Sequence, residues 1–494
     1  MTTFSEGKAM YRSVHLVPAQ CALDLGDGSE RGEYVCQDYI LNALGRPHRA
    51  VNIMYTYYPK DKQWPARISE ACADMAVAFA WDYPYDDYFP FSEDGEQFEQ
   101  MRDIRRHGQE VMLTITIDCS LEDGMLRDIA RKLKPYGRML LRINHECNGD
   151  WFTHNRRFSY SEVADFFVRS ARIVKEEAPN VRTVFCAGLI KEEPEENGEY
   201  KVEYEDEFAE AYDIADVWSA DKYLSLHYGW PFDIAEAGGG RYTDDDPDEI
   251  FEIYRRTYAR LSSRFGNKPF IQAELNADGD VTGPLHQAEP VMRYYDSVRS
   301  ENASWLTGIS MYQFRDRGRL GLEIEDPNNK TVGIRQPLLN EYIKVLNNPY
   351  FAPKLSTGDA ASFPALLRWG SSEDSDGIEL TISFDKTPEF CEVTLQEDLS
   401  LMMEFNGRWF YKAPGVSVID LMPAFFTRPL SCGADIPIRI FATPPDGENH
   451  DTGKEDWMIN QYFTMEHKPE FRIRYVTPKL SKRTVPFDNF QDEK

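Results

Sequence analysis

The sequence predicts an α/β fold: a TIM (β/α)₈ barrel followed by an appended all-β domain that resembles a β-sandwich. Between about residues 48 and 315, eight short apolar, β-rich runs alternate with longer amphipathic stretches, which is typical of a closed parallel barrel. Beyond about residue 350, short strand-like runs follow one another without helical stretches between them. No G-x-G-x-x-G motif follows an early strand, which argues against the competing doubly wound open sheet.

The eight barrel strands are predicted at 50–57, 75–81, 110–117, 138–144, 181–186, 217–223, 269–274 and 308–313. Helices are predicted between them. The segment 161–177 has a broad apolar face, Ser159 or Ser161 as a candidate N-cap, and Pro179 just beyond its end. The segment 247–265 shows the same helical spacing of apolar residues.

Three segments are predicted along the chain of 494 residues. The catalytic barrel spans 48–349, and the β-sandwich-like domain spans 350–494. Residues 1–47 form an N-terminal segment, whose strand-like run at 11–18 either joins the β domain or stands apart from it. The eight cysteines are scattered without a C-x-x-C pair, which favours reduced thiols over a disulfide framework or a structural zinc site.

The charge of the chain excludes some classes of partner. It has 55 basic and 83 acidic residues, for a formal charge of −28, so we expect no nucleic acid and no membrane surface as a partner. The simplest meaning of this charge is solubility. No apolar run approaches the roughly 18 residues of a membrane span, and the first residues lack the pattern of a signal peptide. We therefore expect a cytoplasmic protein.

The end of the fourth predicted strand is unusually polar. Arg142, Asn144, His145 and Glu146 close an otherwise apolar run, and two aromatic residues follow at 151 and 152. A buried strand end tolerates charge only where the charge is paired or used, and barrel enzymes carry their functional groups at the carboxyl ends of strands. The alternative is a salt-bridged strand end with the aromatic residues packed in the core. The clustering favours a carbohydrate site, because flat aromatic faces suit the apolar faces of sugar rings.

The seventh predicted strand supplies a second carboxylate, since its apolar run ends on Glu274. Glu236 and Glu323 are weaker candidates, because the first follows no strong strand and the second lies beyond strand eight. Glycoside hydrolysis requires two carboxyl groups across the scissile bond, one of them protonated at rest. If the carboxyls of Glu146 and Glu274 lie about 5–5.5 Å apart, the mechanism is retaining.

The strand-four motif resembles that of glycoside hydrolase family 26, a family of clan A best known for β-mannanases. The matching residues are Arg142, His145, Glu146, Asn148, Gly149, Trp151 and Phe152. Three weaker similarities fall in the family's order: residues 78–82 on strand two, 216–223 on strand six and 269–274 on strand seven. The strand-three end and Ser219 depart from the family pattern, which leaves a separate family of the same clan open.

The resemblance implies a retaining glycoside hydrolase that cleaves a β-glycosidic bond in an oligo- or polysaccharide by double displacement. It implies Glu146 as general acid/base, Glu274 as nucleophile, Tyr223 as a hydrogen-bond donor to the nucleophile and Trp151 as a sugar platform. No cofactor or metal is implied. The sugar, the linkage, endo or exo action and the oligomeric state stay open.

Further substrate contacts are expected around the barrel mouth. Asn144, His145, Asn148, Phe152 and Arg142 are expected to contact sugar. Trp81, Asp82 and Tyr312 are candidates as well, although they could equally pack and cap strand ends. Arg315 and its neighbour Arg317 could bind an anionic group on the substrate, or could pair with the chain's many acids.

Two other functions fit a barrel of this kind. A non-catalytic glycan-binding protein would use the same mouth without hydrolysis. A metal-dependent hydrolase needs His and carboxylate ligands clustered at strand ends, and His145 alone is plainly placed for that role.

Overall fold

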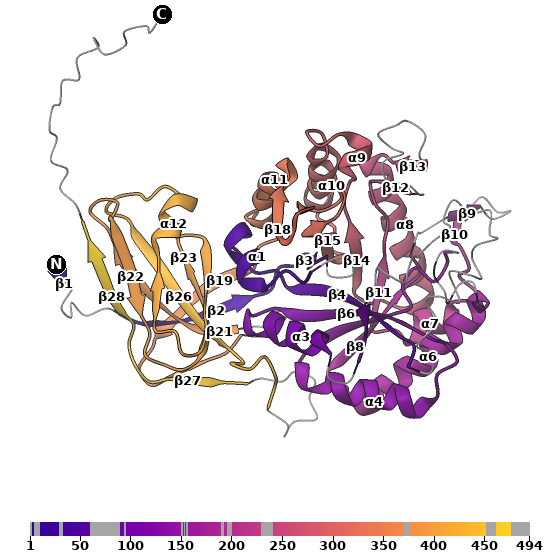
Figure 1. The fold of residues 1–494 in the computed structure, drawn as a ribbon, viewed down its shortest axis with the longest axis horizontal. Coiled ribbons are helices and arrows are strands. Elements are labelled where there is room, and N and C mark those ends of the chain that lie inside the picture. Colours follow the sequence, from indigo (N-terminus) through magenta and orange to yellow (C-terminus); the bar gives the residue numbers. More distant parts are fainter. Residues whose placement is uncertain are drawn as a thin grey trace, which may run out of the picture.

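The computed structural model describes residues 2–3, 10–28, 33–59, 89–92, 95–149, 152, 154, 157–188, 192–194, 200–228, 241–369, 375–450 and 461–475. Within them, an eight-stranded parallel barrel lies beside a domain of antiparallel sheets (Figure 1). This confirms the predicted fold class. No helix among these residues is long and apolar enough to cross a membrane.

Eight parallel strands close the barrel. In chain order they are β3 (Ala22–Gly26), β4 (Ala50–Tyr57), β6 (Glu110–Ile117), β7 (Met139–Ile143), β8 (Val181–Cys186), β11 (Val217–Ala220), β14 (Phe270–Leu275) and β15 (Leu306–Met311). Each pairs with the next, and pairing of β15 with β3 completes the ring. A short strand, β5 (Phe89–Pro90), pairs with the end of β4.

The first two strands differ from the prediction. β3 opens the barrel, so the barrel begins well before the predicted limit at residue 48. The buried Asp24 interrupts the apolar run of β3, and its charge is balanced by Arg49 across the sheet, so the strand escapes a search for apolar runs. The run at 50–57 is therefore the second strand. The strand predicted at 75–81 lies outside the described residues.

The helices cover the outside of the barrel. They are α1 (Gln37–Leu44), α3 (Glu96–Arg106), α4 (Asp123–Leu133), η1 (Lys134–Tyr136), α6 (Tyr160–Glu177), α7 (Ala209–Ile214), α8 (Pro247–Phe265), α10 (Ala288–Ser300) and α11 (Pro337–Leu346). A capping box of Ser159 and Glu162 starts α6, and Asp246 caps α8 ahead of Pro247.

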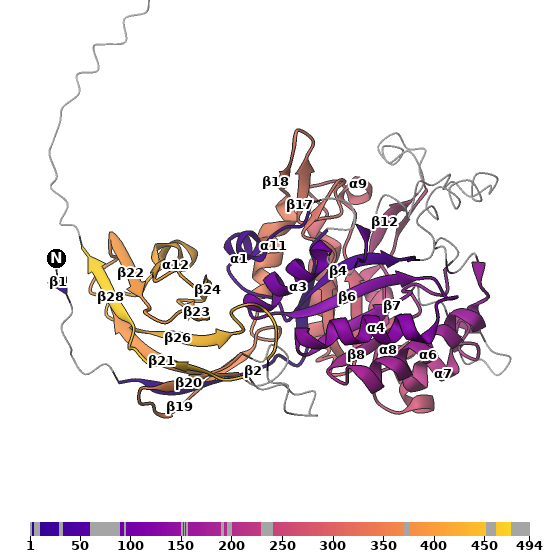
Figure 2. The same cartoon turned by 60° about the horizontal axis from the view of Figure 1, so that its bottom comes forward.

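Short elements follow the carboxyl ends of several strands and build up the barrel mouth. They are β9 (Glu192–Pro194), β10 (Tyr200–Val202), β12 (Ser225–Tyr228), β13 (Arg241–Asp244), α9 (Gly279–Thr282), β16 (Arg315–Asp316), β17 (Glu323–Asp326) and β18 (Asn329–Arg335). The hairpin of β17 and β18 projects beyond the barrel (Figure 2).

The β domain has one six-stranded and one four-stranded antiparallel sheet. The six-stranded sheet has the order β19 (Lys354–Ala360), β2 (Arg12–Val17), β21 (Ser375–Ser383), β26 (Asp435–Thr443), β23 (Ser400–Phe405) and β24 (Arg408–Lys412). The four-stranded sheet has the order β1 (Thr2–Thr3), β28 (Glu470–Arg474), β22 (Phe390–Thr394) and β25 (Val418–Asp420), and β20 (Ala365–Leu367) pairs with β27 (Phe463–Met465). A short helix, α12 (Met422–Thr427), packs against the hydrophobic core of the β domain. The N-terminal strand β2 thus pairs inside the β domain.

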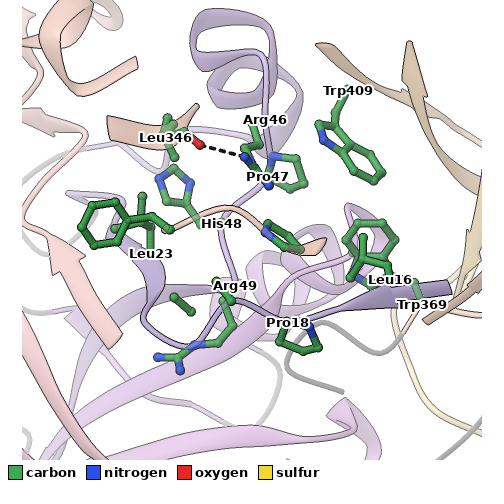
Figure 3. A pocket seen from close by; sticks show the side chains of 15 residues that line it. Leu16, Pro18, Leu23, Arg46, Pro47, His48, Arg49, Leu346, Trp369 and Trp409 are labelled. Carbon is green, nitrogen blue, oxygen red and sulfur yellow. Dashed lines mark hydrogen bonds between the residues drawn. The ribbon is translucent and has the colours of Figure 1, made fainter. Parts of the chain in front are cut away.

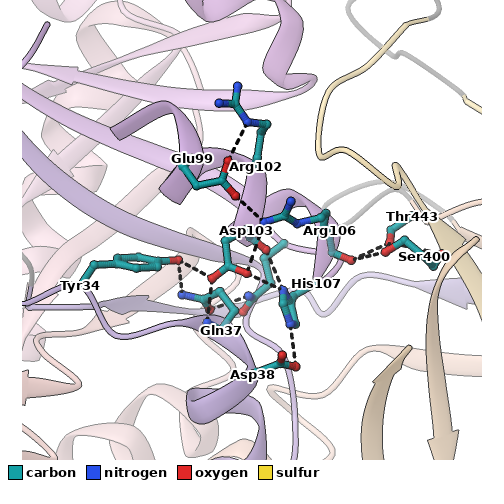
Figure 4. A network of polar contacts seen from close by, with 11 residues as sticks. Tyr34, Gln37, Asp38, Glu99, Arg102, Asp103, Arg106, His107, Ser400 and Thr443 are labelled. Atoms are coloured by element: carbon teal, nitrogen blue, oxygen red, sulfur yellow. Dashed lines mark hydrogen bonds and ion pairs between the residues drawn. The ribbon is translucent and has the colours of Figure 1, made fainter. Parts of the chain in front are cut away.

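The β domain contacts the end of the barrel at which the strands begin. The hydroxyls of Ser400 and Thr443 donate to the Arg106 carbonyl at 3.1 and 2.6 Å (Figure 4). His107, the residue after Arg106, contacts Asp103 and Asp38 through its two ring nitrogens. The centroid of its ring lies 3.9 Å from that of Tyr411. We call this end the closed end of the barrel and the opposite one the mouth.

Candidate active site

The turn after β7 brings Glu146 to the mouth. Asn144 and Glu146 both adopt left-handed backbone angles, with φ of 47° and 51°. Gly188, after β8, packs against this turn so closely that a Cβ there would lie 2.6 Å from the Glu146 Cα. Asn144 holds the turn to strand three, since its side chain accepts from the Ile117 N–H at 2.7 Å and donates to the Ile117 carbonyl at 3.1 Å. Glu146 is half-buried, whereas its neighbours are buried.

Glu274 lies at the end of β14 with both carboxylate oxygens engaged. Arg142 Nη2 donates to Oε1 at 2.6 Å, and the Tyr223 hydroxyl donates to Oε2 at 2.5 Å. His145 Nε2 lies 3.8 Å from Oε1. Three predicted site residues from strands four and six therefore converge on the carboxylate of strand seven, which is 5% exposed. The arrangement fixes the orientation of a carboxylate that still borders the mouth.

Arg142 is completely buried and bonded on all sides. It donates to Thr114 Oγ1 at 2.8 Å and to Asp221 Oδ2 at 2.7 Å, in addition to Glu274. The predicted contact of Arg142 with sugar stays untested, and in this structure its charge is bonded inside the barrel. Asp221 was not among the predicted site residues. It lies in the same strand-six motif as Tyr223, and that motif could have identified it from the sequence.

The electrostatics of this cluster follow from burial. Desolvation raises the pKa of Asp221. The adjacent Arg142 lowers it, but the negative charge of Glu274 adds to the increase. Desolvation and Arg142 hold the pKa of His145 well below its usual range, so this imidazole is neutral. Burial and the charge of Glu274 raise the pKa of Tyr223, and Glu146 adds to the effect, so the phenol keeps its proton and donates. Tyr223 thus responds to the charges of both predicted catalytic carboxylates.

Aromatic side chains pack beneath the mouth. Phe152 is buried between His145, at 4.6 Å between ring centroids, and His154, at 5.4 Å with the rings nearly parallel. Tyr223 contacts Tyr312 edge to face at 5.9 Å. Phe152 is therefore a packing residue here, contrary to its predicted sugar contact. Tyr312 is 8% exposed and borders the same cluster.

Two more predicted contacts have partners within the protein. Arg315 is buried, donates to Glu323 at 3.0 Å and covers the ring of Tyr39. This is the acid pairing that the sequence left as the alternative, so Arg315 is not placed to bind an anionic sugar. Asn148 is buried and donates to Glu203 at 3.4 Å. Trp81, Asp82 and Trp151 lie outside the described residues.

Two groups of side chains could offer metal ligands. The first consists of His145, Asp221 and Glu274, whose ligand atoms lie within 4.8 Å of one another. Arg142 already bonds both carboxylates of this group, so its guanidinium supplies the positive charge that a cation would bring. The second consists of His227, Asp278 and Asp280, in which His227 bonds Asp278 and Arg319 pairs with Asp280 at 3.1 Å. Both groups fit internal ion pairing.

Comparison with known proteins gives matches to solved structures alone. No family model matches the chain, and no curated protein matches it. Similar structures include the catalytic domain of the GH26 endo-β-1,4-mannanase of Bacillus sp. JAMB-750, with 12% identity over 67% of this chain and 86% of that one and a TM-score of 0.39. They also include a glucosidase from Croceicoccus marinus, with 10% identity over 87% and 97% and a TM-score of 0.41. A third is a family 39 glycoside hydrolase from Bacteroides cellulosilyticus WH2, with 10% identity over 89% and 96% and a TM-score of 0.39.

These similarities are too weak to identify the activity of this chain, since identity is 12% or less and the TM-scores lie near 0.4. The three proteins come from more than one glycoside hydrolase family, so the resemblance to family 26 stays a prediction.

Proposed function

We propose that this chain is a retaining glycoside hydrolase, with Glu274 as nucleophile and Glu146 as general acid/base. The observation that carries the proposal is the setting of Glu274. Its two oxygens are held by Arg142 and Tyr223 at the end of strand seven, while the half-buried Glu146 stands at the end of strand four. Two carboxyl groups at opposed strand ends of one mouth are the minimum that glycoside hydrolysis requires.

The proposed reaction has two steps. A Glu274 oxygen attacks the anomeric carbon of a β-glycoside while Glu146 gives its proton to the departing oxygen, which leaves a glycosyl ester on Glu274. Glu146 then takes a proton from water, and the water oxygen displaces Glu274 from the anomeric carbon. The product keeps the configuration of the substrate, and both glutamates return to their starting protonation.

The neighbours of Glu274 suit this role. Arg142 and Tyr223 hold the carboxylate in one orientation before attack, and they stabilise its charge as it leaves the glycosyl ester. The neutral His145 fills the space beside Glu274 without adding a charge that would weaken the nucleophile. Arg142 bonds Asp221 as well as Glu274, so it does not form an exclusive ion pair with the nucleophile.

The proposal is tested in two stages. The purified chain is first screened on aryl β-glycosides and on polysaccharides, and the first anomer released is followed by NMR. We expect the retained anomer. Release of the inverted anomer, or sugar binding without any turnover, would contradict the proposal, and the latter result would favour the glycan-binding barrel.

Glu146→Ala is then assayed on an aryl glycoside whose leaving group needs no acid. Added azide should raise its rate by about tenfold and give a glycosyl azide, because azide needs no general base. Asp118→Ala, which removes a partly exposed carboxyl from the end of neighbouring strand three, is the matched control and should show no azide effect. Equal azide effects in the two variants would remove Glu146 from its assigned role.

A further inference from the structure

A small cavity lies at the closed end of the barrel, far along the strands from the mouth (Figure 3). The segment that leads into β4 lines one side, with Arg46, Pro47, His48 and Arg49. The β domain lines the other side with Trp369 and Trp409. The part of the cavity in which the centre of a water-sized atom fits has a volume of about 40 Å³. Since one water needs about 10–15 Å³ by this measure, the cavity holds roughly three oxygen-sized atoms.

The charge of the lining is opposite to that of the protein. The chain carries −28 overall, yet two arginines and a histidine line this cavity, and no acidic side chain does among the described residues. Arg49 is neutralised by Asp24. Arg46 forms no ion pair among the described residues. Glu404, whose charge acts on it, bonds Arg439 at 2.6 Å, an arginine that it shares with Glu379. Arg46 is therefore the cation of this cavity to which no carboxylate is bonded directly.

The polar atoms that lack hydrogen bonds here are donors. Within the described residues, the Arg46 guanidinium has one acceptor, the Leu346 carbonyl at 2.7 Å. The buried indole Nε1 of Trp369 has none. An indole N–H and a guanidinium cannot accept hydrogen bonds, so a ligand that satisfies them must bring acceptor atoms. A buried donor without a partner costs about 1–3 kcal/mol, which is a measure of what such a ligand would recover.

His48 supplies a third donor. Its Nε2 lies 3.0 Å from the buried Tyr342 hydroxyl, and its Nδ1 has no partner. The phenolic proton of Tyr342 has no other acceptor among the described residues, so the phenol donates to Nε2 and the imidazole proton resides on Nδ1. Burial lowers the pKa of His48 to about 3, so the ring is neutral with this single proton. Burial also lowers the pKa of Arg46, to about 10, which leaves it charged at neutral pH.

The geometry points to a binding site for a small oxyanion, of the size of inorganic phosphate or a short carboxylate, between Arg46 and His48 of the barrel and Trp369 of the β domain. Such an anion brings two acceptor oxygens as a carboxylate or four as phosphate, and a negative charge that can bond Arg46 directly. The volume, with room for roughly three oxygen-sized atoms, limits the anion to this size. Because its donors come from both domains, a bound anion joins them. It therefore stabilises the closed end without touching the mouth.

The experiment uses the full chain and three probes: inorganic phosphate, sulfate and acetate, each titrated at constant ionic strength against sodium chloride. We expect saturable binding by calorimetry and a change in tryptophan fluorescence. We also expect a rise in Tm of about 2 °C once the anion reaches tenfold excess over its Kd. The order of the three probes shows whether a tetrahedral or a planar oxyanion fits.

Three variants locate the site. Arg46→Met keeps the apolar stem and should weaken binding by at least about tenfold, and Trp369→Phe keeps an aromatic ring but should abolish the fluorescence change. Arg408→Met is the matched control, because Arg408, like Arg46, donates to a backbone carbonyl, of Asn42 at 2.8 Å, where the two domains meet, but does not line the cavity. It should bind like the wild type.

Absence of saturable binding for all three probes would overturn the inference, as would equal binding in Arg46→Met and Arg408→Met, which would place the anion elsewhere. If Arg46→Met does not fold, Trp369→Phe decides, because the loss of its indole N–H donor should weaken binding, as measured by calorimetry, relative to Arg408→Met. None of these variants touches Glu146 or Glu274, so the result is independent of the proposed hydrolysis.

Discussion

The two ends of the barrel both bury arginines next to carboxylates, but they balance charge differently. At the mouth, Arg142 bonds both Asp221 and Glu274. At the closed end, Glu110 contacts both Arg182, at 2.9 Å, and Arg138, at 3.6 Å, and Asp24 is paired with Arg49. Among these described residues, two carboxylates therefore share one arginine at the mouth, whereas two arginines share one carboxylate at the closed end.

This difference distinguishes the mouth, where we propose that the reaction occurs, from the closed end, where the charges hold the structure together. Buried carboxylates that are paired with arginines hold neighbouring strands in register. Asp221, which shares Arg142 with a second carboxylate, has a raised pKa and lies at the mouth, and perturbed groups gather where protons are exchanged. Arg46, which forms no ion pair among the described residues, suits the closed end to an anion rather than a reaction.

The largest contrast is expected between Glu274→Gln and Glu110→Gln. Glu274→Gln should lower kcat by about 10³-fold or more because the nucleophile is lost, while the free energy of unfolding stays within about 1 kcal/mol, since Arg142 keeps Asp221 as its partner. Glu110→Gln should lose about 3 kcal/mol of stability, because two buried arginines lose their partner, with kcat unchanged. Steady-state kinetics and urea unfolding measure both. Similar losses of activity in the two variants would break the distinction between the ends.

A second contrast concerns pH at the closed end. Burial by itself lowers the pKa of His107, but hydrogen bonds to Asp103 and Asp38 outweigh it and raise the pKa to about 9. Protonated His107 therefore stabilises the folded chain. The stabilisation is complete below the usual value of 6.5 and is lost as pH rises through 9. We expect a fall of about 3 kcal/mol in unfolding free energy across this range.

Several groups face His107 in this transition: Asp38 from α1, Asp103 and Arg106 from α3, and Tyr411 from β24. His107→Gln should flatten the dependence of stability on pH between 6.5 and 9, as followed by urea unfolding at a series of pH values. An equally steep fall in this variant would assign the effect to other groups.

The smallest contrast concerns single hydroxyls. Tyr223→Phe removes the donor to Glu274 Oε2 and should lower kcat about tenfold in steady-state kinetics, because the carboxylate loses a hydrogen bond that orients it and stabilises its charge. Tyr342→Phe removes a hydroxyl of the closed end, bonded to His48, and should leave kcat unchanged. A loss of similar size in both variants would mean that the hydroxyl on Glu274 has no special role.

Parts of the fold were predictable because the signals are local. Apolar runs of strand length that alternate with amphipathic helices can be recognised from neighbouring residues, and they located seven of the eight barrel strands. β3 was missed because Asp24 is acceptable in a barrel strand only once Arg49 lies beside it. Arg142 and Arg315 were expected to meet substrate because a sequence shows a charge without its partner.

The sequence by itself determined seven of the eight barrel strands and that Glu146 and Glu274 lie at the ends of strands four and seven, since a polar residue that closes an apolar run is visible in a few consecutive positions. Only the tertiary structure decided the partners. Arg142 meets Glu274 across 132 residues and Asp221 across 79, and Arg315 is bonded to Glu323. Closing a barrel brings distant strand ends within hydrogen-bond distance in a low-dielectric interior, where a charge must be paired. The choice of pair therefore depends on the closed ring of strands and not on any single segment.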